Sequence, residues 1–301
     1  MASTLIHLFD NIAGKICYEE PMSKHTWLGV GGNAEAMFIP KDLDDLTSFL
    51  KIKPKEVPVY VLGGGSNLLV RDGGISGVVI KLASPYFKQI VKNNNSITCY
   101  AGLQNTLLKK FLITNELGGL EFLCSIPGTI GGTVKTNAGC FGRCLSDVLI
   151  SANAVDMKGN IHTITNQDFH FSYRHADFPK DWIIISLTLK TLKSDTSTIQ
   201  HILTEHQVYR KAHQPVNKKT AGSTFKNPVG NSAWKLIKES ECDTLTVGGA
   251  KMSEKHCNFM INTGNATAKD CETLGEAIIE RVKNKTGITL EWEIQKIGQD
   301  K

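Results

Sequence analysis

The chain has 301 residues, more than one ordinary compact core holds, so two or three domains are expected. Its hydrophobic fraction of 41% and charged fraction of 21% are those of a globular protein, which argues against a disordered chain. No apolar run approaches the length of a bilayer span, so no membrane insertion is expected. The net charge of +5 arises without long basic blocks, so nucleic acid is not an expected partner.

The N-terminus and the cysteines indicate the compartment. Residues 1–20 lack the cationic start and uninterrupted hydrophobic block of a secretory signal. Eight cysteines are spread over a chain that is long enough to fold without disulfides. Cys140 and Cys144 form a CxxxC motif, but no second pair or nearby histidine completes a tetrahedral site. We therefore expect a cytoplasmic protein that binds no metal.

Strands and helices alternate in the first 120 residues. Apolar runs predict four short strands, at 35–40, 57–62, 77–82 and 97–102. Leucines at helical spacing predict one helix over 42–52, and a second is expected over 105–117, where two glycines end it. This alternation indicates an α+β or α/β arrangement.

The remaining residues continue the mixed pattern. A hairpin is predicted over 148–164 and a strongly β-prone strand over 182–191. A polar helix at 195–211 leads to a C-terminal part with helices predicted at 232–240 and 270–286, the latter preceded by a capping-box pattern. Residues 288–298 alternate like a half-buried strand. We take the start of the polar helix as the boundary of a C-terminal domain.

Two glycine-rich loops stand out. The first, GGGSN at 63–67, directly follows a predicted strand, and the second, SIPGTIGG, occupies 125–132. Glycine allows close backbone approach and unusual dihedral angles, so clustered amides form an anion nest. Two such loops could hold the two phosphates of one dinucleotide. Taken alone, each loop is equally consistent with a tight turn.

A Rossmann site is the first alternative, because residues 29–34 match G-x-G-x-x-A. The context contradicts it, since no apolar strand precedes Gly29 and a short strand follows where a helix should begin. No P-loop motif occurs either, so a P-loop kinase or ATPase is not supported.

Seven segments, in order and spacing, resemble the family of UDP-N-acetylenolpyruvoylglucosamine reductases (UDP-N-acetylmuramate dehydrogenases) in its shorter form. The segments are 25–40, 61–82, 124–142, 171–178, 221–228, 249–262 and 290–298. The resemblance implies an α+β chain with a two-subdomain FAD-binding fold of the vanillyl-alcohol-oxidase type and a C-terminal α+β substrate-binding domain. The expected boundaries are 1–83 and 84–194 for the two FAD-binding subdomains and 195–301 for the substrate-binding domain.

The resemblance also implies the ligands. It indicates noncovalent FAD, NADPH as co-substrate and a monomer that converts UDP-N-acetyl-3-O-(1-carboxyvinyl)-glucosamine to UDP-N-acetylmuramate, a precursor of peptidoglycan. The implied FAD contacts lie in the two glycine loops and a third segment: Gly63, Gly64, Gly65, Ser66, Asn67, Ser125, Ile126, Pro127, Gly128, Gly132, Asn137, Ala138 and Gly139. Tyr173, Lys211 and Asn227 are the implied substrate contacts.

By the same resemblance, Arg174, Ser223 and Glu293 are the catalytic residues. Adding hydride to an enolpyruvyl double bond leaves negative charge beside the carboxylate, and that charge needs support and then a proton. A guanidinium suits the first task because it stays cationic and grips a carboxylate with two donors. The hydroxyl of Ser223 is the expected proton donor, with Glu293 orienting or assisting it as an acid of raised pKa.

Other interpretations remain open at this stage. Singly, such a serine, arginine or glutamate is usually structural, and only their joint occurrence inside family motifs favours catalysis. The main alternative is another FAD-dependent oxidoreductase of the same fold that acts on an alcohol or sugar, with His25 as a place for covalent flavin. A nucleotide-sugar binding module without activity is a third reading. Ala176 and Gln295 depart from the family pattern and put details of substrate contact in doubt.

Overall fold

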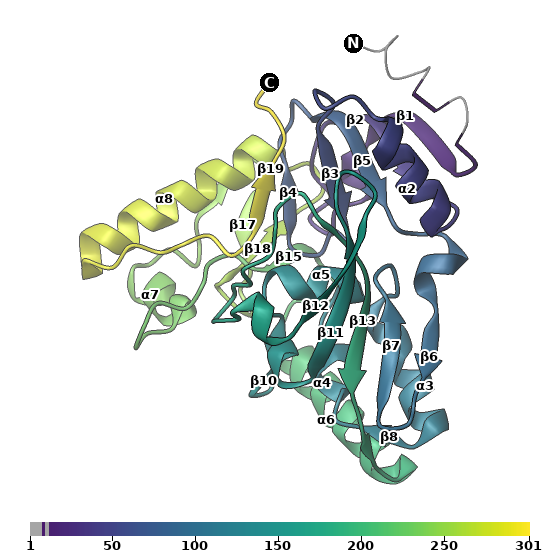
Figure 1. The fold of residues 1–301 in the computed structure, drawn as a ribbon. Helices are drawn as coiled ribbons and strands as arrows, with labels where there is room; N and C mark the ends of the chain where they lie inside the picture. Colours follow the sequence, from purple (N-terminus) through teal and green to yellow (C-terminus); the bar gives the residue numbers. More distant parts are fainter. Residues whose placement is uncertain (1–7, 10–11) are drawn as a thin grey trace. The chain divides into compact units, whose positions relative to one another are not determined.

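The computed structural model describes residues 8–9 and 12–301 (Figure 1). The chain divides into two compact units that interleave along the sequence. Unit 1 comprises the described residues up to 18 together with 36–64 and 77–208, and unit 2 comprises 19–35, 65–76 and 209–301. The mixture of helices and strands in both units confirms the α+β prediction. The proposed functional boundaries after residues 83 and 194 stay predictions.

A first sheet of four strands has the order β1, β2, β5, β3, which are Lys15–Pro21, Asn33–Ile39, Ile75–Lys81 and Val59–Leu62. β3 and β5 are parallel. The predicted helix is α2 (Leu43–Ile52), whose first turn is capped by Asp42 accepting a hydrogen bond from the Asp45 amide at 3.0 Å. Phe49 of α2 packs on Phe38 of β2 with ring centroids 4.9 Å apart, inside the core of unit 1.

A second, antiparallel sheet of five strands completes the core of unit 1. Its order is β12, β11, β13, β7, β6, which are Ile161–Thr165, Leu149–Val155, Ile183–Lys190, Ser96–Tyr100 and Ile90–Lys92. The register of β11 on β12 confirms the predicted hairpin. α5 (Ile130–Lys135), which the sequence pattern missed, packs against β13 and β7.

The rest of unit 1 consists of short elements. The predicted helix over 105–117 is a 3-10 turn, η3 (Asn105–Leu107), followed by α3 (Leu108–Asn115). Four two-residue strands form two pairs. β8 (Leu117–Gly118) pairs with β14 (Leu192–Lys193), and β9 (Gly139–Cys140) pairs with β10 (Arg143–Cys144). The other helices are η2 (Pro85–Lys88), α4 (Glu121–Cys124), η4 (Leu145–Asp147) and η5 (Gln167–Phe169). The long α6 (Thr196–His213) confirms the predicted polar helix.

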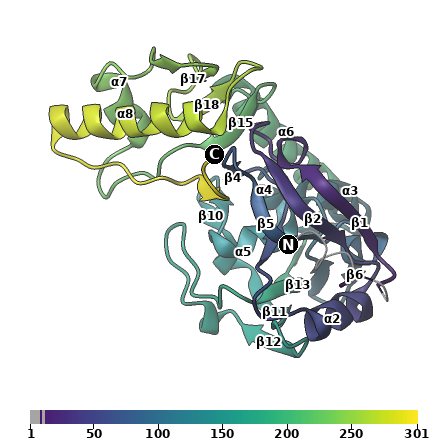
Figure 2. The same ribbon diagram turned by 90° about the horizontal axis from the view of Figure 1, so that it is seen from above.

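Unit 2 has its own core around a four-stranded antiparallel sheet. The order is β15, β18, β17, β16, which are Lys219–Ser223, Phe259–Asn262, Ala250–Met252 and Thr246–Val247. α8 (Ala268–Thr286) packs on β16, β17 and α7 (Ala233–Glu239), and Figure 2 shows β17 and α7 beside it. Its buried face carries Leu274, Ile278 and Val282, and the predicted capping box at Thr267 and Asp270 is present.

The chain end departs from the prediction. The expected strand over 288–298 exists only as β19 (Gln295–Ile297), which pairs in parallel with β4 (Leu68–Val70). The residues before β19 do not pair with β4; Trp292 instead forms an isolated β-bridge with Phe225. A 3-10 turn, η1 (Met22–Lys24), completes the described elements. No helix in the described part of the chain has both the length and the apolarity needed to cross a bilayer.

Candidate active site

The two glycine loops face each other within unit 1. Gly63 and Gly64 follow β3 directly, and a Cβ added at Gly64 would lie 2.6 Å from the Cα of Gly128. A Cβ at Gly63 would lie 3.0 Å from the Thr129 hydroxyl oxygen. Side chains would therefore force the two loops apart, whereas glycine lets their backbone amides gather in one place. This close approach gathers the amides of both loops on one side, where they could bind a diphosphate together.

Neighbouring residues fix the second loop. The buried Asn105 donates from its side chain to the Ile126 carbonyl at 3.0 Å, and its amide donates to the Gly128 carbonyl at 3.0 Å. Gly128 has φ of +120°, a conformation that favours glycine. Ser125, Ile126 and Pro127 are half-buried along this loop, and Gly132 lies within the first turn of α5.

The remaining residues of the first loop belong to unit 2. Gly65 has φ of +65° and faces the backbone carbonyl of His25, so a side chain could not be accommodated there. Its own carbonyl accepts a hydrogen bond from the Trp27 amide at 2.9 Å. Ser66 is half-buried, and Asn67 donates to the Glu293 carbonyl at 3.1 Å. The first loop thereby contacts the backbone of Glu293, a predicted catalytic residue.

In unit 1 the third predicted FAD segment contacts Arg174. Asn137 donates from its side chain to the Ser172 carbonyl at 3.3 Å, and its side-chain oxygen accepts the Ser146 amide at 3.0 Å. Arg174 donates to the Gly139 carbonyl at 3.4 Å. These bonds bring the turn that carries Arg174 beside the predicted cofactor segment 137–139.

Arg174 itself sits in a tight turn closed by a bridge between Ser172 and His175. Its φ of +55° is a left-handed conformation that costs free energy in a residue other than glycine. The guanidinium lies 5.3 Å from the centre of the Tyr173 ring, a cation–π contact, and the ring is 55% exposed. The turn thus presents both residues of the motif together.

Ser223 and Glu293 come together in unit 2, through their backbones. The bridge of Phe225 with Trp292 places the two segments antiparallel, and the Glu293 amide donates to the Thr224 carbonyl at 2.8 Å. Glu293 therefore follows one residue of this bridge directly, and Ser223 lies two residues before the other. Arg174 belongs to unit 1, so the joint action of all three stays a prediction.

A buried asparagine that the sequence prediction did not single out holds the serine segment. The Asn258 side chain accepts from the Phe225 amide at 3.0 Å and donates to the Phe225 carbonyl at 2.8 Å. Its backbone carbonyl accepts the Thr224 amide at 2.7 Å, and the Thr224 hydroxyl accepts the Met260 amide at 3.0 Å. Asn258 and Thr224 lie inside the segments 249–262 and 221–228 that resemble the family, and nothing else in the sequence marks them as functional.

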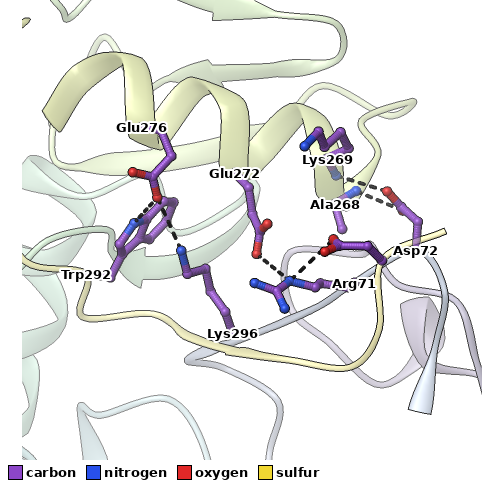
Figure 3. Close-up of polar contacts among 9 residues, drawn as sticks. Arg71, Asp72, Ala268, Lys269, Glu272, Glu276, Trp292 and Lys296 are labelled. Carbon is purple, nitrogen blue, oxygen red and sulfur yellow. Dashed lines mark hydrogen bonds and ion pairs between the residues drawn. The ribbon is translucent and has the colours of Figure 1, made fainter. Parts of the chain in front are cut away.

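Helix α8 anchors Trp292, which precedes Glu293, and Lys296 of β19 (Figure 3). The Trp292 indole donates to the Glu276 carboxylate at 2.9 Å, and the Lys296 ammonium lies 3.3 Å from the same carboxylate and 4.5 Å from the indole centre. The indole packs directly on Gly275, where an added Cβ would overlap the ring. The segment around Glu293 is therefore clamped onto the helix.

Figure 3 also shows the contacts that Arg71 and Asp72, the two residues after β4, make with α8. Arg71 follows β4, and its guanidinium lies 3.0 Å from Glu272 of α8 and 3.6 Å from Asp300. Asp72 accepts hydrogen bonds from the Ala268 and Lys269 amides, both at 2.9 Å, in the first turn of α8. The neighbouring charge of Glu272 and its hydrogen bond raise the pKa of Arg71.

Two of the predicted substrate contacts, Asn227 and Lys211, make hydrogen bonds within the protein. The Asn227 side chain accepts the Ala233 amide at 2.9 Å, at the start of α7. The Lys211 carbonyl accepts the Lys255 ammonium. Gln295, one of the departures from the family pattern, donates its amide to the Asn67 carbonyl and so belongs to the pairing of β19 with β4.

Two histidines of the recognised segments and their surroundings have structural partners. The His25 imidazole lies 2.8 Å from the Glu20 carboxylate. His256 accepts the Asn258 amide at 3.3 Å, and burial lowers its pKa. Within residues 8–9 and 12–301 no cluster of three or more histidine, cysteine or acidic side chains could hold a metal ion.

The glycine loops and the division of the chain into two units indicate a FAD-binding protein, and comparisons with known proteins support this class. Residues 34–165 match the family model described as a FAD binding domain. Residues 214–297 match the model of the UDP-N-acetylenolpyruvoylglucosamine reductase C-terminal domain. The chain belongs to the UDP-N-acetylenolpyruvoylglucosamine reductase family.

Close relatives support this assignment over nearly the full length. The reductase of Bradyrhizobium sp. is 46% identical over 95% of this chain and 94% of the relative, and that of Paramagnetospirillum magneticum is 47% identical over 97% and 94%. The crystal structure of the reductase from Thermus caldophilus superposes with a TM-score of 0.80 at 33% identity, covering 95% of this chain and 99% of that one. The predicted fold class is confirmed by this match.

Proposed function

We propose that this chain is the reductase that converts UDP-N-acetyl-3-O-(1-carboxyvinyl)-glucosamine to UDP-N-acetylmuramate with NADPH, using noncovalent FAD. The observation that carries the proposal is an identity of 46–47% to named reductases over nearly the whole of both chains. Both halves of the family are matched, the FAD binding domain and the C-terminal domain. The reaction belongs to peptidoglycan precursor synthesis, which takes place in the cytoplasm.

The glycine loops are the proposed place for the FAD diphosphate. Gly63 and Gly64 on one side and residues 125–132 on the other approach closely, and a side chain at Gly64 would clash with the Gly128 backbone. Asn137, Ala138 and Gly139 form the third proposed contact, and Gly65, Ser66 and Asn67 continue the first loop. When bound, FAD supplies the hydride that the enolpyruvyl double bond receives, and NADPH replenishes it.

Arg174 is proposed to bind the substrate carboxylate. Its guanidinium is always cationic and offers two parallel donors, so it stabilises the negative charge that develops beside the carboxylate. The turn that holds it is rigid, because the bonds of Asn137 to Ser146 and Ser172 support it. A donor held in place before the reaction costs no reorganisation when the charge appears.

Ser223 is proposed to give a proton to the substrate carbon, and Glu293 to orient or assist that transfer. The observation that supports the pair is the antiparallel bridge of Phe225 with Trp292, which brings the two segments together. Asn258 reinforces it by two hydrogen bonds to Phe225. Tyr173, Lys211 and Asn227 are the proposed sugar-nucleotide contacts. We also propose that the enzyme is a monomer whose functional domains are residues 1–83, 84–194 and 195–301.

One experiment tests the proposed activity directly. Purified protein is mixed anaerobically with NADPH, and the visible flavin absorbance is followed. We expect bleaching, then full recovery when the enolpyruvyl sugar nucleotide is added, with one equivalent of UDP-N-acetylmuramate formed. UDP-N-acetylglucosamine, which lacks the double bond, is the control and should restore nothing. Recovery with a simple alcohol-derived carbonyl but not with the enolpyruvyl compound would contradict the proposal.

A further inference from the structure

One histidine on α6 contacts both glycine-containing segments of unit 1. The Nδ1 atom of His206 lies 3.3 Å from the Ser125 hydroxyl oxygen, at the start of the second loop. Its ring also stacks on Phe141, with ring centroids 3.8 Å apart and planes 2° from parallel. Phe141 stands two residues after Gly139, at the end of the third segment. A single side chain therefore links the second glycine loop to Phe141, which follows the third segment that the proposed function assigns to FAD.

The polar side of this contact is the hydrogen bond between His206 and Ser125. Burial lowers the pKa of His206, which favours the neutral imidazole. A neutral imidazole has one donor nitrogen and one acceptor nitrogen. Its Nδ1 atom either accepts from the Ser125 hydroxyl or donates to it, according to the tautomer. His206 thus fixes the rotamer of the serine that opens the loop.

The stacking side of the contact supports an unfavourable backbone. Phe141 has φ of +54°, a left-handed conformation that is rare and costly for a bulky residue. Its ring is 38% exposed, so burial in the core does not hold it in place. The parallel imidazole supplies the packing surface instead. A histidine that only filled the core would have no reason to contact two loop ends in this way.

We propose that His206 is a positioning residue for FAD, which acts by holding Ser125 and Phe141 in the conformation that binds the cofactor. The inference rests on the proposed assignment of residues 125–132 and 137–139 to FAD. His206 itself need not touch the cofactor. Loss of the hydrogen bond should leave the loop in several conformations, which reduces apparent affinity by the fraction that remains competent.

The test compares variants that separate the two contacts. His206→Phe keeps an aromatic ring that can stack on Phe141 and removes the nitrogen that hydrogen-bonds Ser125. His206→Ala removes both contacts. The same helix offers a matched control in His201→Phe, because His201 is largely exposed and lies 3.3 Å from Glu205. Release of FAD from the diluted holoenzyme is followed by flavin fluorescence, and melting is measured in saturating FAD.

We expect the dissociation constant for FAD to rise about fivefold to tenfold in His206→Phe, as for loss of one hydrogen bond, and further in His206→Ala. His201→Phe should match the unaltered enzyme. In a Ser125→Ala background, His206→Phe should add little, because both changes remove the same bond. Equal FAD release from His206→Phe and His201→Phe, or additive effects with Ser125→Ala, would overturn the inference. A parent protein that holds no FAD would instead refute the proposed function.

Discussion

The packing of Trp292 on α8 yields a prediction with a definite sign. Replacing Gly275 by alanine in an open helix interior would stabilise the protein by about 1 kcal/mol, since glycine is a poor helix former. Here the new Cβ would overlap the Cη2 and Cζ2 atoms of the indole, so the ring must move. Overpacking of this kind costs about 1–3 kcal/mol, and loss of the indole hydrogen bond to Glu276 adds about 1.5–3 kcal/mol.

We therefore expect Gly275→Ala to lower the free energy of unfolding by about 2 kcal/mol or more, with the helix preference partly offsetting the clash. Turnover should also fall, because Trp292 adjoins Glu293. Chemical unfolding and steady-state rates measure the two effects.

A rescue makes the test specific. Trp292→Leu removes the ring atoms that clash, so in that background Gly275→Ala should be neutral or stabilising by up to about 1 kcal/mol. Gly275→Ala that is as stable as the parent protein in the unaltered background would refute the packing argument.

Three further predictions concern the site and the thiols. Arg174→Lys should lower turnover by about 10²-fold, because an ammonium cannot reproduce the bidentate grip; near-normal rates would remove Arg174 from its role. Acid precipitation should release all FAD into the supernatant, and flavin retained by the pellet would instead favour covalent attachment at His25. Burial raises the pKa of the Cys99, Cys124 and Cys271 thiols to about 12. A thiol reagent at neutral pH should therefore not modify these three cysteines until the protein unfolds, and mass spectrometry of the labelled peptides measures this.

The sequence predicted local elements well where a side-chain pattern marked them. The leucine spacing of α2, the capping box of α8 and the turn of the β11–β12 hairpin are all found. The glycines at 63, 64 and 128 allow a close backbone approach of the two loops, whereas their predicted role in binding FAD stays a prediction.

Long-range pairing could not be predicted. Residues 288–294 alternate like a strand, yet Trp292 bridges Phe225 and only Gln295–Ile297 pair with β4. Nothing in the local pattern indicates which of two distant segments a strand will join. The same holds for Asn258, whose two bonds to Phe225 depend on the tertiary fold, and for His206, which lies on a helix predicted only as polar.

The central claim is that Ser223 delivers a proton only after the double bond has received its hydride. Reduction by NADPH needs no such proton, so the two halves of the reaction can be separated by rapid-mixing absorbance under anaerobic conditions. Ser223→Ala should be bleached by NADPH at close to the parent rate, while reoxidation by the enolpyruvyl substrate slows by about 10²–10⁴-fold and Ser223→Cys recovers part of that loss. A Ser223→Ala enzyme that is slow in bleaching but normal in reoxidation would contradict the account.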